Sequence, residues 1–297
     1  MAKRSLISVF LLLGAVILFF IGVALLVLPL AGDSLPLAKG DRVGVVEVSG
    51  LIRDAKTTLN HLKKFRENDR IRAIVVRVNS PGGAVGPSQE ILEEVIRTRE
   101  KKKVVASLGT VAASGGYYIV SGADIIMANP GTLTGSIGVI MNFTNVEQLL
   151  SKIGLELFNL KAGKYKDVGS PLRPMTPVEK EYIQGLLDNV HEQFIRDVAH
   201  GRRMLVHKVR EVGDGRIFTG EEGKNLGLVD ALGNLPDAID LAGRLGGIKG
   251  KVEAAYPPKE KLSLFGLLFG DDPEEILARW QAESNPVPAY LYAPGIR

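Results

Sequence analysis

A run of 28 residues without a charged side chain, Ser5 to Gly32, is the feature that most constrains how this chain can fold. Between Leu6 and Leu28 the run consists almost wholly of Leu, Ile, Val, Phe, Ala and Gly. A helix of about 20 such residues is long enough to cross the hydrocarbon core of a membrane. The sequence therefore predicts one N-terminal transmembrane helix.

Two basic residues set the expected orientation of this helix. Lys3 and Arg4 precede the run, so the positive-inside rule places the N-terminus in the cytoplasm and the rest of the chain outside it. A cleavable signal peptide is the alternative, but its apolar region usually has about 7–15 residues. No clean small-x-small cleavage site follows the run. We expect residues 1–40 to be a cytoplasmic stub, a signal anchor in the cell (inner) membrane and a short linker.

Composition excludes several classes of protein. Hydrophobic residues make up 45% of the 297 and charged residues 24%, which is unlike a disordered or collagen-like chain. The absence of Cys excludes a disulfide framework, a thiolate zinc site and a cysteine nucleophile. The four His residues show no metal-ligand spacing, so we expect no metal. The basic stretches Glu100–Lys103 and Gly201–Arg210 lack interleaved aromatic residues, which argues against a nucleic-acid partner.

Beyond the apolar run, short β-branched segments alternate with stretches of helical periodicity. This alternation implies βαβ units and a mainly parallel sheet. Strands are expected at Val43–Val48, Arg72–Val78, Val104–Leu108, Ile125–Ala128 and Ile137–Met141, and helices at 55–68 and 88–102.

Two capping boxes predict further helices, and the end of the chain has a different character. Thr176–Glu179 should open a long helix that reaches about Gly201, and Thr219–Glu222 should open a helix that ends near Leu226. We expect one α/β domain over residues 41–250 and a C-terminal extension over residues 251–297. The tail Pro286–Arg297 is expected to be extended and exposed, either partly disordered or in contact with a partner.

Two glycine-rich turns follow predicted strands and carry the candidate chemistry. They are Asn79–Gly83 and Val111–Tyr118, and both can reach the crevice beyond the carboxyl ends of a parallel sheet. Ser114 is flanked by residues with almost no bulk, which suits a nucleophile at a helix N-terminus with backbone N–H groups alongside. The alternative is that both segments are tight turns and Ser114 is only an N-cap. Neither turn has the Gly-Lys-Ser/Thr ending of a phosphate-binding loop, and Gly-x-Ser-x-Gly is absent around Ser114.

Four motifs in order resemble one known family. They are Asn79-Ser-Pro-Gly-Gly83, Ala112-Ala-Ser-Gly-Gly-Tyr-Tyr118, Thr132-Leu-Thr-Gly-Ser-Ile-Gly-Val139 and Lys164-Tyr-Lys-Asp167. Over about residues 40–245 the chain resembles the short, single-repeat form of the signal peptide peptidase A (SppA) family. The resemblance implies an α/β, Clp-protease/crotonase-like fold of repeated ββα units. It also implies a membrane-anchored serine endopeptidase that needs no cofactor.

The resemblance also implies a role for individual residues. Ser114 matches the nucleophile and Lys166 the general base, while Ser136 matches a serine that hydrogen-bonds the lysine. The N–H groups of Gly83 and Gly115 match the oxyanion hole. Neutral lysine would take the serine proton, an acyl-enzyme would form, and water would complete the hydrolysis.

Lys166 must lose its proton near neutral pH to act as a base, and the charged residues beside it affect how easily it does so. A lysine with a reference pKa near 10.4 needs desolvation or nearby positive charge to become a base. Adjacent Asp167 would oppose that change unless it faced away, as it would in an extended segment. Lys164 would then share the face of Lys166, which makes it the main rival for the base.

The family also suggests substrates and an assembly. The implied substrates are cleaved signal peptides and other hydrophobic peptides at the membrane surface. One repeat is too small to close a groove, so we expect a homo-oligomeric ring, an octamer by resemblance. In such a ring Ser114 and Lys166 either meet across subunits or form the dyad within one chain. Three alternatives stay open: a related Ser–Lys protease for one membrane-protein partner, a crotonase-type acyl-CoA enzyme, and a non-enzymatic scaffold.

Overall fold

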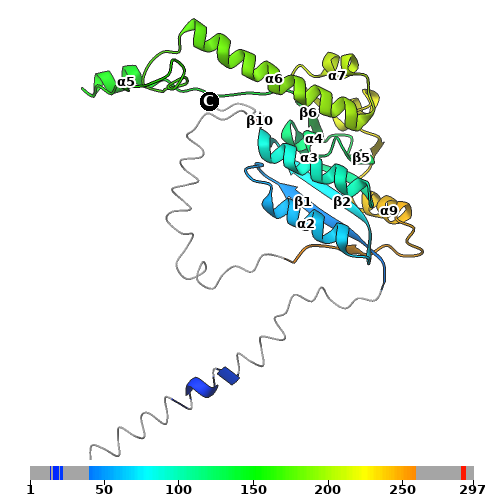
Figure 1. Ribbon diagram of the computed structural model, residues 1–297. Helices are drawn as coiled ribbons and strands as arrows, with labels where there is room; N and C mark the ends of the chain where they lie inside the picture. Colours follow the sequence, from blue (N-terminus) through cyan, green and yellow to red (C-terminus); the bar gives the residue numbers. More distant parts are fainter. Residues whose placement is uncertain (1–13, 15, 20, 23–39, 259–288, 292–297) are drawn as a thin grey trace, which may run out of the picture. The chain divides into compact units, whose positions relative to one another are not determined.

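The computed structural model describes residues 14, 16–19, 21–22, 40–258 and 289–291 (Figure 1). Contacts divide the chain into two units, of which the larger holds residues 40–257 and 261–297. Residues 14, 16–19 and 21–22 are helical, but most of the predicted transmembrane helix lies outside the described residues. Where the chain is described, it has no helix that is both long enough and apolar enough to span a membrane.

A parallel-rich sheet forms the centre of the larger unit. Its core strands β1 (Arg42–Ser49), β2 (Ile71–Ser80) and β4 (Lys103–Ala113) are parallel and rich in Val and Ile, as expected for strands covered on both faces. The main path of the sheet runs β7-β6-β4-β2-β1-β9, and β5 and β8 join it through β4. The shorter strands are β5 (Ile125–Ala128), β6 (Leu133–Gly135), β7 (Ile217–Thr219), β8 (Ala231–Leu232) and β9 (Ala254–Ala255).

Helices cover the sheet on both faces, and each face has its own hydrophobic cluster (Figure 1). One cluster joins the sheet to α2 (Lys56–Glu67), α3 (Val85–Arg99) and α6 (Pro177–Arg202), and the other joins it to α9 (Leu235–Leu245). The remaining described helices are α4 (Gly115–Tyr118), α5 (Glu147–Lys152), α7 (Val206–Val212) and α8 (Gly220–Asn225). This mixed α/β architecture fits the expected Clp-protease-like fold.

Strand β4 changes partner halfway along its length. Its first half pairs with β5 from Val105 to Leu108, and its second half pairs with β6 from Val111 to Ala113. The strand predicted at Ile137–Met141 is wrong. The chain leaves the sheet after Gly135, and only Ile140 of that segment forms an isolated bridge, to Ala289. The end of β4 lies between β2 and β6, directly before α4 begins.

Both predicted capping boxes are confirmed. The Glu179 N–H donates to the Thr176 hydroxyl at 3.3 Å, and the Glu179 carboxylate accepts the Thr176 N–H at 2.9 Å. Thr219 and Glu222 make the same pair of bonds at the start of α8. A third box, between Asn234 and Asp237, opens α9, which the sequence analysis did not predict.

The C-terminal residues contribute to this unit. β9 pairs with β1, and β10 (Ala289–Leu291) pairs in antiparallel fashion with β3 (Gly82–Ala84). The expectation of an exposed tail is wrong at Tyr290, whose side chain is completely buried.

Candidate active site

Ser114 stands at the junction of β4 and α4 in a strained backbone conformation. Its φ is 53° and its ψ is −120°, values that cost free energy in a residue with a Cβ. The Ser114 N–H donates to the carbonyl of Gly135 at 2.8 Å, and its own carbonyl accepts the N–H groups of Tyr117 and Tyr118. These three bonds hold the residue in place. Strain that is fixed by its surroundings is typical of active sites.

The Ser114 hydroxyl is buried and has no hydrogen-bond partner among the described residues. A buried polar atom without a partner costs about 1–3 kcal/mol, so native proteins keep few of them. The strained backbone and the unpaired hydroxyl of Ser114 both lower stability. The N-cap alternative fails as well, because the Ser114 side chain caps no backbone N–H of α4. Both observations indicate a chemical role for the hydroxyl.

The two predicted oxyanion glycines lie side by side next to Ser114. A Cβ placed on Gly115 would lie 3.1 Å from the Gly83 nitrogen and 3.1 Å from the Gly82 Cα. The turn after β2 therefore packs directly against the start of α4. Two backbone N–H groups at this position can stabilise a negative charge on a carbonyl oxygen that is attacked by Ser114.

Gly83 allows this close packing because it has no side chain. A Cβ on Gly83 would lie 2.1 Å from the Ile52 carbonyl oxygen. The backbone of Ile52 is tied to the same turn, since its N–H donates to Gly82 at 2.9 Å and its carbonyl accepts the Ala84 N–H at 2.8 Å. The backbone of Ile52 thus fixes the direction of the Gly83 N–H.

We expect Gly83→Ala to displace this turn, to lower the free energy of unfolding by roughly 2–3 kcal/mol and to remove most activity. Gly86→Ala is the matched control, because a Cβ on Gly86 meets no atom within 4 Å. Thermal melts and peptide hydrolysis should separate the two variants. Equal activity in both would show that the Gly83 position has no role in catalysis.

Ser136 is the second strained serine of the site. It directly follows Gly135, the residue that accepts the Ser114 N–H, and its φ is 52°. Its own N–H donates to the Arg216 carbonyl at 2.8 Å, and the residue is 7% exposed. Among the described residues, Ser114, Ser136 and Arg203 are the non-glycine positions with positive φ. The structure therefore brings Ser114, Ser136, Gly83 and Gly115 together.

His191 supports this segment, a role that the sequence analysis missed. Its side chain is half-buried on α6. Its Nε2 lies 3.2 Å from the Ile137 carbonyl and 2.7 Å from the Gly213 carbonyl. Because both partners are acceptors, Nε2 carries the proton. Neither the position of His191 on its helix nor its residue type indicates this contact from the sequence alone.

Lys166 is not brought to Ser114 within the described chain. It is exposed, and the Ser114 hydroxyl makes no bond to it. The extended segment expected here is wrong, since residues 164–169 form turns and the Lys166 N–H donates to Gly163. The rival Lys164 is also exposed, and its Nζ lies 5.0 Å from the Tyr165 ring centre.

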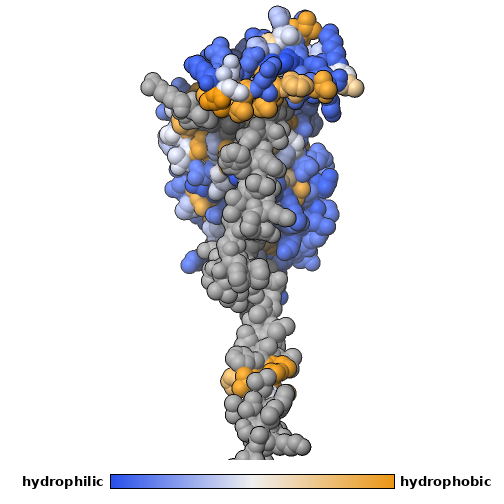
Figure 2. Space-filling view, turned by 90° about the vertical axis from the view of Figure 1, so that its left-hand side faces the viewer, coloured by the Kyte–Doolittle hydropathy of each residue, from blue (hydrophilic) through white to orange (hydrophobic). Residues whose placement is uncertain are grey.

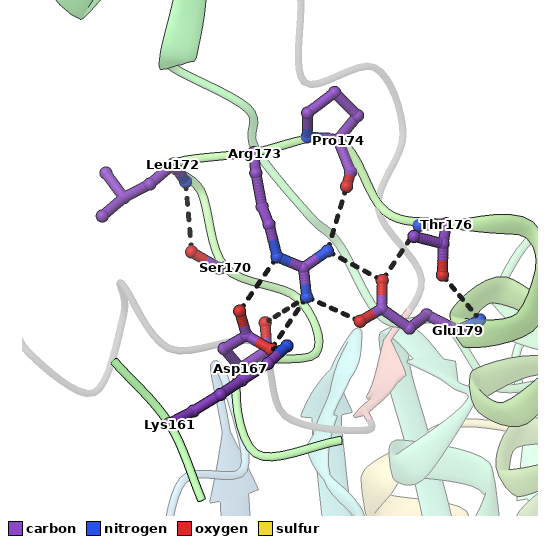
Figure 3. A network of polar contacts seen from close by, with 8 residues as sticks. All are labelled: Lys161, Asp167, Ser170, Leu172, Arg173, Pro174, Thr176 and Glu179. Carbon is purple, nitrogen blue, oxygen red and sulfur yellow. Dashed lines mark hydrogen bonds and ion pairs between the residues drawn. The ribbon is translucent and has the colours of Figure 1, made fainter. Parts of the chain in front are cut away.

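The Asp167 carboxylate accepts hydrogen bonds from Arg173 (Figure 3). The Arg173 guanidinium lies between the Asp167 and Glu179 carboxylates, with N–O distances of 2.8 and 2.6 Å, and Lys161 also bonds Asp167. The hydrogen bond from Arg173 is the main cause that lowers the pKa of Asp167, and it also lowers the pKa of Glu179, to about 2. Both carboxylates are therefore charged near neutral pH, and they tie the Lys166 turn to the start of α6.

Comparison with known proteins identifies the family. The model of peptidase family S49 matches residues 96–249, which include Ser114, Ser136 and Lys166. The chain belongs to peptidase family S49. A protein of Synechocystis sp., provisionally named a protease, is 46% identical over 209 residues, which are 70% of this chain and 75% of the relative. Serine protease SPPA of Arabidopsis thaliana chloroplasts is 34% identical over 238 residues, 80% of this chain and 33% of the relative. Protease 4 of Salmonella typhi is 35% identical over 224 residues, 72% of this chain and 36% of the relative.

Membership of family S49 gives the site its general chemistry. The chain is an SppA-like serine protease, and Ser114 is the residue whose geometry fits a nucleophile. The described residues contain no cluster of three or more His, Asp or Glu side chains arranged for a metal ion. The geometry of Ser114 and the two glycines suits acyl transfer from a peptide to the Ser114 hydroxyl.

Proposed function

We propose that this S49 peptidase is a membrane-anchored endopeptidase that degrades cleaved signal peptides and other hydrophobic peptides with a Ser–Lys dyad. The observation that carries the proposal is the strained, buried and unpartnered Ser114 hydroxyl beside the glycine turn of Gly83. In this proposal the apolar run Ser5–Gly32 anchors the protein in the cell membrane, with the protease domain outside the cytoplasm.

The proposed chemistry proceeds in two steps. Neutral Lys166 takes the Ser114 proton as the hydroxyl oxygen attacks the peptide carbonyl, and the N–H groups of Gly83 and Gly115 stabilise the resulting oxyanion. The protonated lysine then gives its proton to the leaving amine, and an ester to Ser114 remains. Lysine next activates a water molecule, which hydrolyses the ester and frees the serine.

A homo-oligomeric ring would supply the lysine that the single chain does not place at Ser114. The arm, which we define as residues 143–186, contains α5, the Lys166 turn and the first part of α6. It exposes many apolar side chains, which is unusual for a monomer in water. They include Leu149 (61% exposed), Phe158 (78%), Leu160 (93%) and Tyr182 (48%). Figure 2, which views the domain from the side of α5, shows apolar side chains gathered in a band.

In the proposed ring, which is an octamer by family resemblance, the arm packs on the next subunit and presents Lys166 to that subunit's Ser114. Packing there would also exclude water from around the lysine. Arg173 and Lys161 both pair with the Asp167 carboxylate, so they partly neutralise the negative charge that adjoins Lys166 in the sequence.

A direct assay separates this proposal from the alternatives. The full-length protein in detergent should cleave a synthetic signal peptide and should carry a fluorophosphonate label on Ser114. Cleavage restricted to one membrane protein would support a dedicated partner instead. Binding of coenzyme A without peptide cleavage would support an acyl-CoA enzyme. A protein that takes no label and cleaves no peptide would be a scaffold.

A further inference from the structure

The parallel strands begin at one edge of the sheet, opposite the edge that carries Ser114. Strands β1, β2, β4 and β5 are parallel neighbours, so their first residues share one edge and their last residues share the other. Strands β8 and β9 pair in parallel with β5 and β1, so they begin at the same edge. Ser114 directly follows the last residue of β4 and therefore lies at the other edge.

Basic residues outnumber acidic ones where the strands begin. We call this region the basic edge and define it as residues 41–42, 67–72, 99–103, 124, 202–203, 230 and 244–253. It holds 12 Lys and Arg against 7 Asp and Glu, a net charge of +5, whereas the whole chain has a net charge of +4. The remainder of the chain therefore sums to −1, and the positive charge of the protein is concentrated at this edge.

Most of the acidic residues of the basic edge are already neutralised. The four ion pairs are Asp41–Arg72, Asp124–Lys103, Asp230–Arg202 and Glu253–Arg42. Six exposed basic side chains make no hydrogen bond or ion pair with any other described residue. They are Arg70, Lys101, Arg203, Arg244, Lys249 and Lys251. These six side chains are available to an anion from outside the chain.

A pocket of about 360 Å³ opens in the basic edge. Four basic and two acidic side chains line it, namely Arg99, Lys103, Arg202 and Arg203 with Asp124 and Asp230. Leu245, which is 40% exposed, lines the same pocket. A surface that combines net positive charge with an exposed apolar side chain suits the headgroup region of an anionic membrane.

The chain enters the basic edge soon after the apolar run Ser5–Gly32. Arg42, the first residue of β1, follows Gly32 by ten residues. Ten residues span at most about 35 Å even when fully extended. If the run is the membrane anchor, the basic edge is the edge of the sheet that the anchor keeps near the lipid headgroups.

We propose that the basic edge binds the anionic phospholipid headgroups of the membrane that anchors the protein, and that the pocket beside Arg203 takes a headgroup phosphate. The inference rests on the anchor in the proposed function and adds a contact of the protease domain itself. Lys and Arg side chains are attracted to an anionic membrane surface, and salt weakens this attraction. The basic edge therefore distinguishes anionic from zwitterionic lipid.

Lysine labelling of the full-length protein tests this inference. The protein is inserted into nanodiscs of phosphatidylcholine alone, or of equal parts phosphatidylcholine and phosphatidylglycerol, and is treated with an amine-acetylating reagent. Lys101, Lys249 and Lys251 should react at least about threefold more slowly in the anionic discs, because the headgroups cover them. Lys56, which is exposed and opens α2 after the end of β1, should react equally in both. High salt should remove the difference.

Two substitutions of one charge each provide a matched comparison. Arg203→Gln should reduce the slowing of the three lysines at least about twofold, because it removes an unpaired cation from the pocket. Lys56→Gln removes a charge from the opposite edge of the sheet and should leave the slowing unchanged. Equal effects of the two substitutions, or equal labelling rates of the wild-type lysines in the two lipids, would overturn the inference. If a short DNA duplex slowed the three lysines and anionic lipid did not, the basic edge would bind nucleic acid instead.

Recovery of the protein with the nanodiscs distinguishes this inference from the proposed function. Protein that is recovered with neither kind of disc would disprove both the anchor and the basic edge. Protein that is recovered only with anionic discs would disprove the anchor and keep the basic edge. If the lysines respond to anionic lipid as expected and the protein cleaves no peptide, the proposed activity fails while lipid binding stands.

Discussion

Ser114→Ala should lower kcat for signal-peptide hydrolysis by about 10⁴-fold or more, because the acyl-enzyme can no longer form. The change removes a hydroxyl that makes no hydrogen bond, so no partner is left unsatisfied. We therefore expect the melting temperature to stay the same or to rise slightly. Loss of activity without loss of stability is the combination that marks a catalytic group.

Ser80→Ala is a useful control for this experiment. Ser80 is also a buried serine near the glycine turn, and its hydroxyl accepts the Gly82 N–H at 3.1 Å. Its removal should destabilise the turn by about 1 kcal/mol and leave much of the activity. If Ser114→Ala retained more than about one tenth of wild-type kcat, another group would have to be the nucleophile.

Mixed rings of Ser114→Ala and Lys166→Ala subunits should recover activity that neither variant has alone. If each site takes its serine from one subunit and its lysine from the next, random assembly at equal ratio leaves about one quarter of the sites intact. The expected activity is then about one quarter of the wild-type value. The measurement is peptide hydrolysis by co-expressed subunits that carry different affinity tags.

A Lys164→Ala variant, assayed in the same way, tests which of the two lysines of the arm is the base. If Lys166 is the base, the Lys164→Ala variant should stay active. Lys164 is a matched control because it is exposed like Lys166 and lies on the same turn. Tandem purification through both tags shows whether mixed rings have formed. Mixed rings without recovered activity would place the dyad within one chain.

Local sequence patterns predicted most of the central sheet. The β-branched runs gave β1, β2 and β4 because a strand covered on both faces must be apolar along its length. The two threonine capping boxes gave the starts of α6 and α8 because a cap depends on residues only three positions apart. The neighbourhood of Ser114 was also predictable, since the glycines allow the close packing observed there.

Features set by contacts between distant residues could not be predicted in this way. The Lys166 segment was expected to be extended, but Gly163 and Gly169 have φ values of 100° and 79°, and the segment turns. The tail Pro286–Arg297, which includes Tyr290, was expected to be extended and exposed. Its burial depends on a partner strand more than 200 residues earlier in the chain. The described chain does not bring Lys166 to Ser114, and no local sequence pattern predicts the distance between two such separate segments.

The slot between β3 and Ile140 has one consequence for what can enter it. It bonds the main chain of its occupant on both edges, so the occupant must be extended over at least Ala289–Leu291 or their equivalents. The main-chain groups of a helix are already paired with each other. A helical segment therefore has to unwind locally before it fits. A slot of this kind suits extended or easily unwound chains and excludes segments that keep a stable helix.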